Sequence, residues 1–528
     1  MKKLLSIALI ILLVLCLNAI QLPANPAMAD PADIYVPSDY STIQEAIDAA
    51  SPGDTVFVAA GTYSPSTNGE VFPIRMRNGV SLQGAGAGST IMDAENTNGV
   101  IACDGINIAT TKIDGFTITN GSTNDGGGIY LSYSSVKISN NTITENNATD
   151  SGGGIFLYRS FPTISNNAIT DNTARGWGGG ISINLSSGTI ANNIISGNSI
   201  EGFCGGGIYV NAWLSGFPPP IIRNNIITGN SAPYIGGGIS SINASPTITN
   251  NIISNNSTTS YGGGIEIEGV VVSSPTIINN TIFGNNASHG GGFYIRQQSN
   301  PTISNNIIAS NTASSSGGGI WADGTASPSI DYNDVWDNST DNYFGCSAGL
   351  NDISQNPLFV NPAADDYHLQ SSSPCIDIGD NTAASGLPTD FEGDPRIWDG
   401  DGNGDAVVDI GADEYYRFTA TVDIAPDVLN LKSKGKWITV YIEFPQNYDL
   451  ADINVSTIKL NDTVSAELKP ASIGDYDDDG ILDLMVKFDR GEVTSILEAG
   501  DYVEVKISGE LNDGTKFNGT DYITVKLK

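Results

Sequence analysis

A Gly-Gly-Gly triplet followed by Ile or Phe recurs eight times in the central part of the chain. Successive triplets start 26 to 31 residues apart, at residues 126, 152, 178, 205, 236, 262, 290 and 317. Each repeat also contains three short runs rich in Ile, Thr and Ser, with Gly and Asn at the junctions between them. None of these runs is long enough for a helix, and three strands per repeat suit one turn of a parallel β-helix. The repeat therefore predicts an all-β fold, a parallel β-helix of about ten coils.

The hydrophobic residues of the repeats predict how this β-helix is filled. Three columns would stack along interior lines, because one coil alone cannot bury its apolar side chains. The first column follows the glycines, the second starts at Ile138 and ends at Ile330, and the third starts at Ile143 and ends at Trp336. The first column consists of Ile129, Ile155, Ile181, Ile208, Ile239, Ile265, Phe293 and Ile320.

Asparagine pairs such as Asn140-Asn141 mark a second fixed point in the repeats. Asn tolerates the positive φ of a tight bend, and its side chain can hydrogen-bond from coil to coil as a ladder. We interpret these asparagines as structural and not as ligands.

Different patterns flank the repeats. Residues 41–50 place Ile43, Ala46, Ile47 and Ala50 on one helical face, which predicts a helix that caps the first coil. From residue 416 onward, longer strands alternate apolar and polar residues, which predicts a small C-terminal β-sandwich. We expect this module to be a spacer, an attachment module or a carbohydrate-binding module.

The chain starts with the features of a signal peptide. Lys2 and Lys3 precede an apolar run, and Ala27-Met28-Ala29 has the small residues of a cleavage site. We therefore expect a secreted monomer, extracellular or at the cell surface, that is not inserted in the membrane after cleavage. The predicted segments are 1–29 (signal peptide), 30–120 (cap and first irregular coils), 121–345 (regular coils), 346–416 (end of the β-helix with an acidic segment) and 417–528 (β-sandwich).

The charge of the chain excludes some partners. It has 23 Lys and Arg against 57 Asp and Glu, a formal net charge of −34 at pH 7. Non-specific binding to nucleic acid or to anionic membranes requires clustered basic residues, so neither partner is expected. The chain has only two histidines, His289 and His368, which excludes a His-rich metal centre, and neither lies in a recognisable catalytic motif.

Several stretches resemble a known superfamily. Thr42-Ile43-Gln44-Glu45-Ala46-Ile47, Gly53-Asp54-Thr55-Val56 and Gly61-Thr62-Tyr63 resemble the start of pectin-lyase-like right-handed β-helix proteins, and the coils look like the generic repeats of that superfamily. Residues 355–415 resemble the choice-of-anchor Q segment that occurs beside such helices, in the stretches 356–360, 367–369, 373–377 and 409–412. The resemblance covers residues 34–415 and implies a right-handed parallel β-helix. No catalytic motif of the superfamily can be carried over residue by residue.

Export permits disulfides, and four cysteines follow the signal peptide. Cys103 and Cys204 are several coils apart, so stacking would separate them by roughly 20 Å, which is too far for a bond. Cys346 and Cys375 are therefore the predicted disulfide, which would close the end of the β-helix onto the following segment.

Two acidic loops have the spacing of calcium ligands. Alternating oxygen ligands with Gly at the sixth position match the opening of a calcium loop, although Ile410 and Val486 replace the usual Glu at position twelve. We predict structural calcium at both loops, and the alternative is a pair of solvated acidic turns. The first loop contains Asp399, Asp401, Asn403, Asp405 and Asp409, and the second contains Asp475, Asp477, Asp479 and Asp483.

The outward-facing positions after the glycines carry aromatic residues at coil spacing. Such faces could stack on sugar rings, and they could equally form cross-strand ladders without a ligand. The predicted carbohydrate-binding residues are Tyr130, Phe156, Tyr158, Tyr209, Tyr294 and Trp321.

The weak catalytic candidates are Glu266, Glu268, Arg296 and Asp323. Glu266 and Glu268 share one strand face at a separation that glycosidases use, and Arg296 is on the next coil. The alternative is a charged patch that keeps the surface soluble. A lyase would need a cation and a base at one place, and the basic residues of the repeats are scattered over separate coils.

These observations favour a scaffold that binds a polysaccharide or a cell-surface glycan and that carries structural calcium. Two alternatives stay open. One is a polysaccharide lyase or glycoside hydrolase that acts on the outer sheet face, and the other is a surface adhesin.

Overall fold

The computed structural model describes residues 31–212, 216–401, 403–445, 448–512 and 515–527, and these group into two compact units. The first unit contains the described residues up to 331 together with 335–354. The second contains residues 332–334 and the described residues from 355 onward. The predicted signal peptide, residues 1–29, lies outside the described residues.

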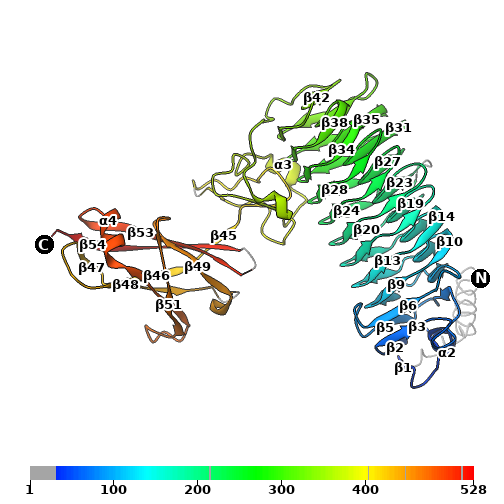
Figure 1. Ribbon diagram of the computed structural model, residues 1–528, viewed down its shortest axis with the longest axis horizontal. Helices are drawn as coiled ribbons and strands as arrows, with labels where there is room; N and C mark the ends of the chain where they lie inside the picture. The colour runs from blue at the N-terminus through cyan, green and yellow to red at the C-terminus, as the bar shows by residue number, and fades with distance from the viewer. Residues whose placement is uncertain (1–30, 213–215, 402, 446–447, 513–514, 528) are drawn as a thin grey trace, which may run out of the picture. The chain divides into compact units, whose positions relative to one another are not determined.

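The first unit is a parallel β-helix of stacked coils (Figure 1). A 12-stranded sheet runs from β1 (Asp33–Val36) to β40 (Ser329–Asp331), and an 11-stranded sheet runs from β3 (Gly61–Tyr63) to β41 (Asp334–Trp336). The post-glycine sheet has 11 strands, from β4 (Ile74–Arg75) to β42 (Tyr343–Phe344), and those from β11 (Ile129–Ser132) to β39 (Ile320–Ala322) follow the glycine corners. The pre-glycine sheet has eight strands that precede them, from β10 (Ser122–Asp125) to β38 (Thr312–Ser316).

The all-β class is confirmed, with two corrections to the predicted repeat. The longest sheet has 12 strands, which exceeds the expected number of coils, and the regular coils have a fourth strand in the pre-glycine sheet. These additional strands are short, such as β18 (Thr173–Ala174), and rich in Ser, Thr and Asn. They lack a long apolar alternation because they are short and bury mostly small residues, such as Ala148 and Ala174, with Ile200 as the one large residue of that cluster.

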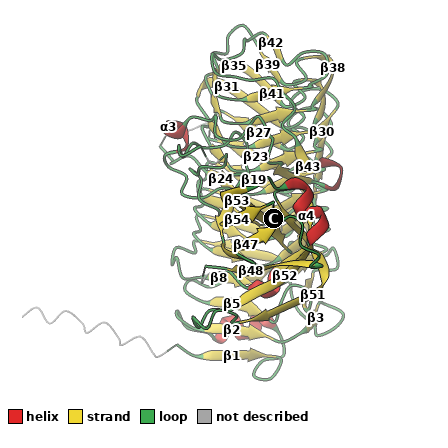
Figure 2. Cartoon of the chain, turned by 90° about the vertical axis from the view of Figure 1, so that its left-hand side faces the viewer, coloured by secondary structure: helices red, strands yellow, loops and turns green. Residues whose placement is uncertain are grey.

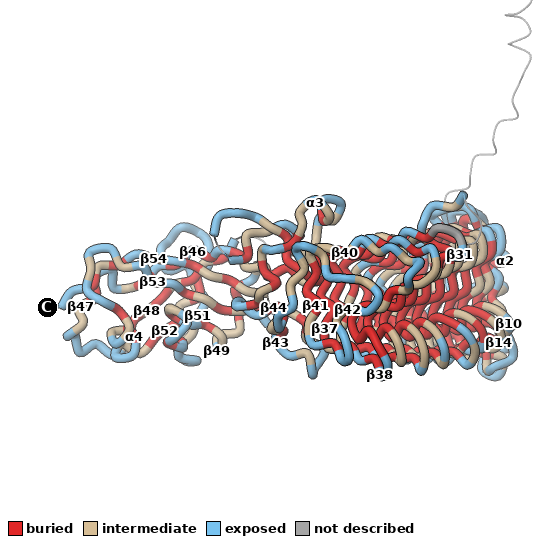
Figure 3. Tube along the Cα trace, turned by 90° about the horizontal axis from the view of Figure 1, so that it is seen from above, coloured by how far each residue is buried: buried red, intermediate tan, exposed pale blue. Residues whose placement is uncertain are grey.

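The isoleucine columns line the interior as predicted, and Figure 3 shows the buried residues running through successive coils. Every member of the first column is fully buried, from Ile129 to Ile320. The prediction is wrong at the end of the third column. Trp336 is half-buried, and Val335 takes the interior position. A shift of one residue along a strand moves each side chain to the opposite face, which explains the error.

The asparagine pairs form the predicted ladder. The first residue of a pair, such as Asn166, makes the bend with φ of 57°. The second is buried: the Nδ2 of Asn167 donates to the Oδ1 of Asn193 on the next coil at 3.0 Å. A second ladder was not predicted, and it consists of Asn146, Asn172, Asn198, Asn230, Asn256, Asn285, Asn311 and Asn338.

Each glycine triplet forms a tight corner between a pre-glycine strand and a post-glycine strand. Gly152 opens its corner with φ of 67°, which L side chains rarely adopt. A Cβ on Gly153 would lie 2.5 Å from the carbonyl oxygens of Gly179 and Thr173. The backbones therefore approach so closely at the corner that only glycine fits.

Few helices accompany the strands, as Figure 2 shows. The helix α2 (Ile43–Ala49) is the predicted cap: it buries Ile43, Ala46 and Ile47, and the Thr42 side chain accepts from the Glu45 backbone N–H at its N-terminus. In the described part of the chain, no helix is both long and apolar enough to cross a membrane.

The second unit starts with an irregular segment, residues 355–415, that contains the antiparallel pair β43 (Phe359–Asn361) and β44 (Asp366–Leu369) and the short helix α3 (Asn381–Ala384). A β-sandwich follows, and Ile438, Val440 and Ile442 are buried in its core as predicted. Its six-stranded sheet consists of β45 (Arg417–Thr419), β47 (Val428–Asn430), β49 (Ile453–Leu460), β50 (Val464–Ser465), β53 (Gly500–Leu511) and β54 (Lys516–Lys526). Its four-stranded sheet consists of β46 (Thr421–Ala425), β48 (Trp437–Glu443), β51 (Glu467–Gly474) and β52 (Asp483–Asp489), and the helix α4 (Arg490–Ile496) follows β52.

The predicted disulfide between Cys346 and Cys375 is wrong, because all four described cysteines are free thiols. Cys346 packs against the core of the β-helix. Cys375 is fully buried in the second unit, where its Sγ lies 3.4 Å from a carboxylate oxygen of Asp334. Each thiol therefore has a separate environment that the spacing of cysteines along the chain does not reveal.

Candidate functional site

A groove follows the corner between the pre-glycine and post-glycine sheets, because outward side chains of both sheets converge there. Its main part is a cavity of about 410 Å³. A second cavity of about 240 Å³ shares Asp125 and Tyr130 with the first and extends the hollow to Pro73 and Ile101. We call the two cavities together the corner groove. The main part is lined by Asp125, Tyr130, Asp150, Ser151, Phe156, Tyr158, Trp177, Ser182, Asn184, Tyr209 and Asn211.

The corner groove extends over several coils. At about 4.8 Å per strand, its five post-glycine strands give a length of roughly 19 Å. These strands are β7 (Ile101–Asp104), β11 (Ile129–Ser132), β15 (Ile155–Tyr158), β19 (Ile181–Asn184) and β23 (Ile208–Asn211). The groove is therefore long and open, a shape that suits a chain-like ligand.

Aromatic rings form much of the groove lining. The rings of Tyr130 and Phe156 are stacked with their centroids 5.6 Å apart. The ring centroid of Trp177 lies 6.3 Å from that of Tyr209 and 5.0 Å from that of Phe203. Four predicted binding residues, Tyr130, Phe156, Tyr158 and Tyr209, line this one cavity. Trp177 was missed because it precedes a glycine triplet, and only the positions after the glycines were considered. Inspection of the residue immediately before each glycine triplet would have identified Trp177 as a candidate.

Tyr294 and Trp321, the other two predicted binding residues, lie outside the corner groove. Their rings are stacked at 4.4 Å, and Tyr261 lies 4.7 Å from Tyr294. His289 stacks on Tyr261 at 5.6 Å, and its Nδ1 is 2.9 Å from the Ser316 Oγ. This second aromatic cluster covers the corner on the later coils.

The polar part of the groove is neutral or acidic. Asn184 and Asn211 offer amide groups, and the Nδ2 of Asn211 donates to the Tyr209 hydroxyl at 3.1 Å. Asp125 and Asp150 contribute carboxylates, and burial raises the pKa of Asp125. No Lys or Arg is among the residues that line the two cavities. The groove therefore suits a neutral ligand better than an anionic one.

Three of the four catalytic candidates meet beside the second aromatic cluster, where Glu266 is aligned with Tyr294 on the next coil. Glu268 is aligned with Arg296 on the next coil and pairs with its guanidinium. Glu266 has an oxygen 3.7 Å from the Arg296 Nε, and its other oxygen accepts from the Ser240 hydroxyl at 2.7 Å. Glu266 is 0% exposed, and this burial raises its pKa to about 8. The interpretation as a solvated surface patch is therefore wrong for Glu266, which is sealed within the corner.

Asp323 is placed differently from the other three candidates. Its carboxylate accepts from the Gln297 backbone N–H at 2.7 Å and from the backbone N–H groups of Thr325 and Ala326 at 2.8 and 2.9 Å. These contacts hold a turn. Asp323 therefore has a structural position, and no described ion pair links it to Arg296.

The two acidic loops have the turn geometry that their glycines predict. The backbone N–H of Gly404 donates to Asp399 at 2.9 Å, and that of Gly480 donates to Asp475 at 3.1 Å. Both glycines have positive φ, 100° and 91°.

Only some of the predicted calcium ligands lie close together in the two loops. Oxygens of Asp475, Asp477 and Asp483 lie within 4.8 Å of one another, and Asp477 and Asp479 form a second group with Glu443. In the first loop, Asp399 and Asp401 group with Asp377, a residue that the sequence analysis did not consider.

The remaining predicted ligands of the first loop have other contacts. The Asp409 carboxylate is buried and accepts from the backbone N–H groups of Asp377 and Tyr415, both at 2.7 Å. The Asn403 Nδ2 donates to Asp401 at 3.0 Å, and the Asp405 backbone N–H donates to the Asn403 Oδ1 at 2.8 Å. The expected five-residue ligand set is therefore not assembled at this loop.

A buried arginine in residues 355–415 was also missed. The Arg396 guanidinium donates to the carbonyl oxygens of Ala412 and Gly411, each at 2.7 Å, and its Nε is 3.5 Å from Glu414. Burial raises the pKa of Glu414 to about 10. His368, on the same segment, lies 3.0 Å from Glu392 and 2.6 Å from Asp366, and these carboxylates raise its pKa to about 10. These contacts fix an irregular segment that has few strands.

Comparisons with known proteins bear on the fold. The family model described as "Protein of unknown function (DUF1565)" matches residues 36–241, and the model "Right handed beta helix region" matches residues 269–361. A search of curated protein sequences found no match.

Among solved structures, the chain is similar to pectate lyase Pel9A, with 14% identity, a TM-score of 0.43, and coverage of 73% of this chain and 97% of that one. It is also similar to the A-module of the mannuronan C-5 epimerase AlgE6 of Azotobacter vinelandii, with 17% identity, a TM-score of 0.33, and coverage of 60% and 94%. For the PL6 family alginate lyase AlyGC, the identity is 16%, the TM-score 0.33, and the coverage 62% and 54%.

The two family matches together cover most of the coils, and the parallel sheets of the structure agree with them. By fold, the first unit is therefore a right-handed parallel β-helix.

Proposed function

We propose that this chain is a secreted or cell-surface β-helix protein that binds a neutral glycan along the corner groove. The observation that carries the proposal is the convergence of Tyr130, Phe156, Trp177 and Tyr209 on one open groove. Aromatic rings present large apolar faces on which sugar rings can stack. Asn184 and Asn211 supply donors and acceptors beside these rings, which suits the hydroxyl groups of a sugar.

Binding is a better interpretation of the groove than cleavage. A uronate lyase requires a cation for the substrate carboxylate and a base for the adjacent proton, and the residues that line the groove include no Lys, Arg or His. The buried pair of Glu266 and Arg296 is sealed from solvent on the glutamate side. A glycosidase needs two carboxyl groups that reach the scissile bond, and in the predicted pair of Glu266 and Glu268 the first carboxyl group is fully buried.

We expect Trp177→Ala to weaken glycan binding roughly tenfold, because the loss of a stacking surface costs about 1–1.5 kcal/mol. Isothermal titration calorimetry with neutral oligosaccharides, selected first on a glycan array, measures the effect. Tyr234→Ala is the matched control, since Tyr234 is an exposed aromatic residue of the same unit that does not line the groove. Equal affinities of the two variants, or an array without any neutral ligand, would contradict the groove proposal.

Structural calcium is the second part of the proposal. Asp475, Asp477 and Asp483 bring three carboxylates together, and Ca²⁺ prefers such oxygen ligands. Without a cation, these like charges repel one another within the turn. The residues present therefore fit a calcium ion, which would stabilise the end of the β-sandwich from which β52 starts.

We expect millimolar calcium to raise the melting temperature of the second unit and a chelator to reverse the effect. Asp477→Asn should remove most of this response, since Asp477 belongs to both carboxylate groups of the loop. Differential scanning calorimetry of the full chain with and without calcium tests this. Asp501→Asn, at an exposed position in another strand of the same unit, is the control. An identical calcium response in the wild-type protein and Asp477→Asn would show that the loop is a solvated acidic turn.

A further inference from the structure

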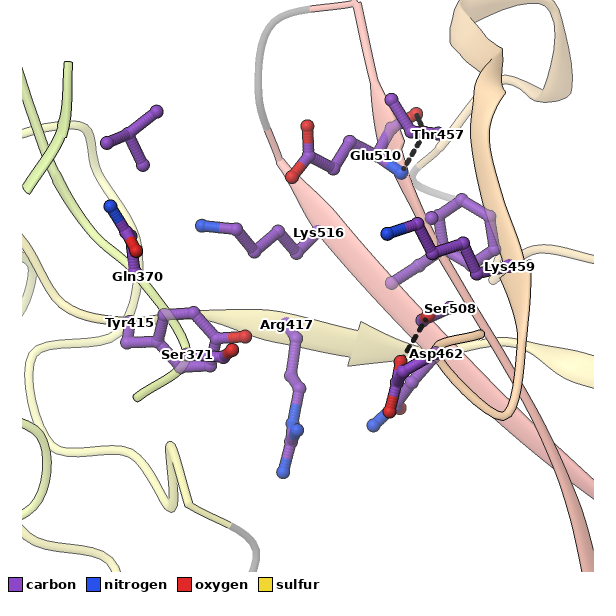
Figure 4. A pocket seen from close by; sticks show the side chains of 14 residues that line it. Gln370, Ser371, Tyr415, Arg417, Thr457, Lys459, Asp462, Ser508, Glu510 and Lys516 are labelled. Carbon is purple, nitrogen blue, oxygen red and sulfur yellow. Dashed lines mark hydrogen bonds between the residues drawn. The ribbon is translucent and has the colours of Figure 1, made fainter. Parts of the chain in front are cut away.

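A pocket of about 630 Å³ in the second unit gathers basic residues in an otherwise acidic chain (Figure 4). Arg417 on β45 is aligned with Lys516 on β54, and Lys459 on β49 is aligned with Ser508 on β53. These strands are neighbours in the six-stranded sheet, so the three basic side chains share its outer face. Tyr415 lies on the opposite wall (Figure 4).

Among the described residues, the three basic side chains have no acidic partners. Within the part of the chain that the structure describes, none of Arg417, Lys459 and Lys516 forms an ion pair. The Lys516 ammonium donates to the Leu369 carbonyl oxygen at 3.3 Å and lies 4.8 Å above the Tyr415 ring. Both contacts position the ammonium without neutralising it. An ammonium has three donors, so donors remain for a ligand.

The acidic residues of the pocket only partly offset this charge. Glu510 and Asp462 line it, and Asp462 accepts from the Ser508 hydroxyl at 2.9 Å. Three cations against two carboxylates leave a local charge of +1, although the chain as a whole carries −34. A local excess of positive charge in an acidic protein attracts anions selectively to that place.

We propose that this pocket binds an anionic saccharide through its carboxylate or sulfate group. Arg417 and Lys459 are the charged recognition residues, and the planar guanidinium of Arg417 can hold two oxygens of such a group. Gln370, Ser508 and Asn518 line the same pocket and can hydrogen-bond sugar hydroxyls. The volume lies within the range of small-molecule sites, about 300–1,000 Å³.

This site is independent of the corner groove. The groove lining has no basic residue, whereas the pocket is defined by three. The two sites belong to different units, and the groove suits a neutral ligand whereas the pocket suits an anionic one. Each proposal can therefore fail without the other.

Calorimetric titration of the full chain with three disaccharides tests the proposal: one with a uronate carboxylate, one with a sulfate group, and an uncharged one of the same linkage. We expect at least one anionic disaccharide to bind. In the Trp177→Ala variant, whose corner groove is weakened, the uncharged disaccharide should bind at least tenfold more weakly than the anionic one. Which anionic disaccharide binds identifies the recognised group. Arg417→Gln and Lys459→Gln should each lower the affinity at least fivefold, and Lys469→Gln, an exposed lysine of the four-stranded sheet, should change it less than twofold.

Lys459 is exposed on a sheet surface, so its replacement tests the site without disturbing the core. Trp177→Ala should leave anionic binding unchanged, which separates this site from the groove. The proposal is overturned if neither anionic disaccharide binds, if the uncharged one binds the Trp177→Ala variant as tightly as the anionic one does, or if Arg417→Gln and Lys459→Gln bind as the wild-type protein does.

Discussion

Asn198→Ala should lower the free energy of unfolding of the β-helix by roughly 4 kcal/mol or more, because each buried polar group left without a partner costs about 1–3 kcal/mol. The Asn198 Oδ1 accepts from the backbone N–H and the Nδ2 of Asn172 at 3.1 and 3.0 Å. Its Nδ2 donates to the Ile169 carbonyl at 2.8 Å and to the Asn230 Oδ1 at 3.0 Å. Alanine removes all four interactions at once.

The neighbouring bend supplies a matched control. Asn192 is exposed and has φ of 57°, so Asn192→Gly keeps the backbone conformation and disturbs no buried ladder. Urea unfolding followed by circular dichroism compares the two variants, and Asn192→Gly should stay within about 1 kcal/mol of the wild-type protein. If Asn198→Ala is no less stable than Asn192→Gly, the ladder does not stabilise the coils as argued.

These two asparagines also show how far the sequence alone could lead. The pairs at 140, 166 and 192 predicted bends and a ladder, and the structure confirms both. The second ladder, which includes Asn198, was missed because different residues precede its members, such as Glu145, Asp171 and Gly197. Periodicity therefore identified the coil, and only the structure showed that each coil has two buried asparagines.

The candidate site was harder to predict than the fold. Alternation along the strands correctly placed Tyr130, Phe156 and Tyr209 on the outer face of the post-glycine sheet. The same alternation gave Glu266 a solvated position, yet that residue is fully buried. Alternation distinguishes the two faces of one strand, but it contains no information about side chains of adjacent coils that cover the outer face, such as Ser240 and Arg296 at Glu266. Trp177 precedes its glycine triplet and therefore lies outside the alternation of the post-glycine strands.

The free energy of unfolding should fall as the pH rises from about 4.3, where an unfolded Glu titrates, to about 8, because Glu266 keeps its proton in the folded state over this range. The protonated Glu266 contributes its full stabilisation below the pKa of the unfolded state, and this stabilisation is lost as the pH rises through the pKa of the folded state. Burial raises the pKa of Glu266, because an ionised carboxylate is unfavourable away from water. Two ionised carboxylates, Glu266 and Glu268, would also share the single positive charge of Arg296. The loss should amount to several kcal/mol, at about 1.4 kcal/mol per pKa unit.

Glu266→Gln isolates this contribution, because glutamine has nearly the same shape and does not ionise. The variant should match the wild-type protein within about 1 kcal/mol at pH 5 and exceed its stability by several kcal/mol at pH 9. Urea unfolding at both pH values measures the difference, and Glu201→Gln, an exposed glutamate of the same unit, should follow the wild-type protein throughout. Asp409 and Glu414 also have raised pKa values, so the wild-type protein alone cannot assign the effect to one residue. A Glu266→Gln variant that loses stability with pH as steeply as the wild-type protein would place the proton elsewhere, and Glu266 would then be ionised within the corner at neutral pH.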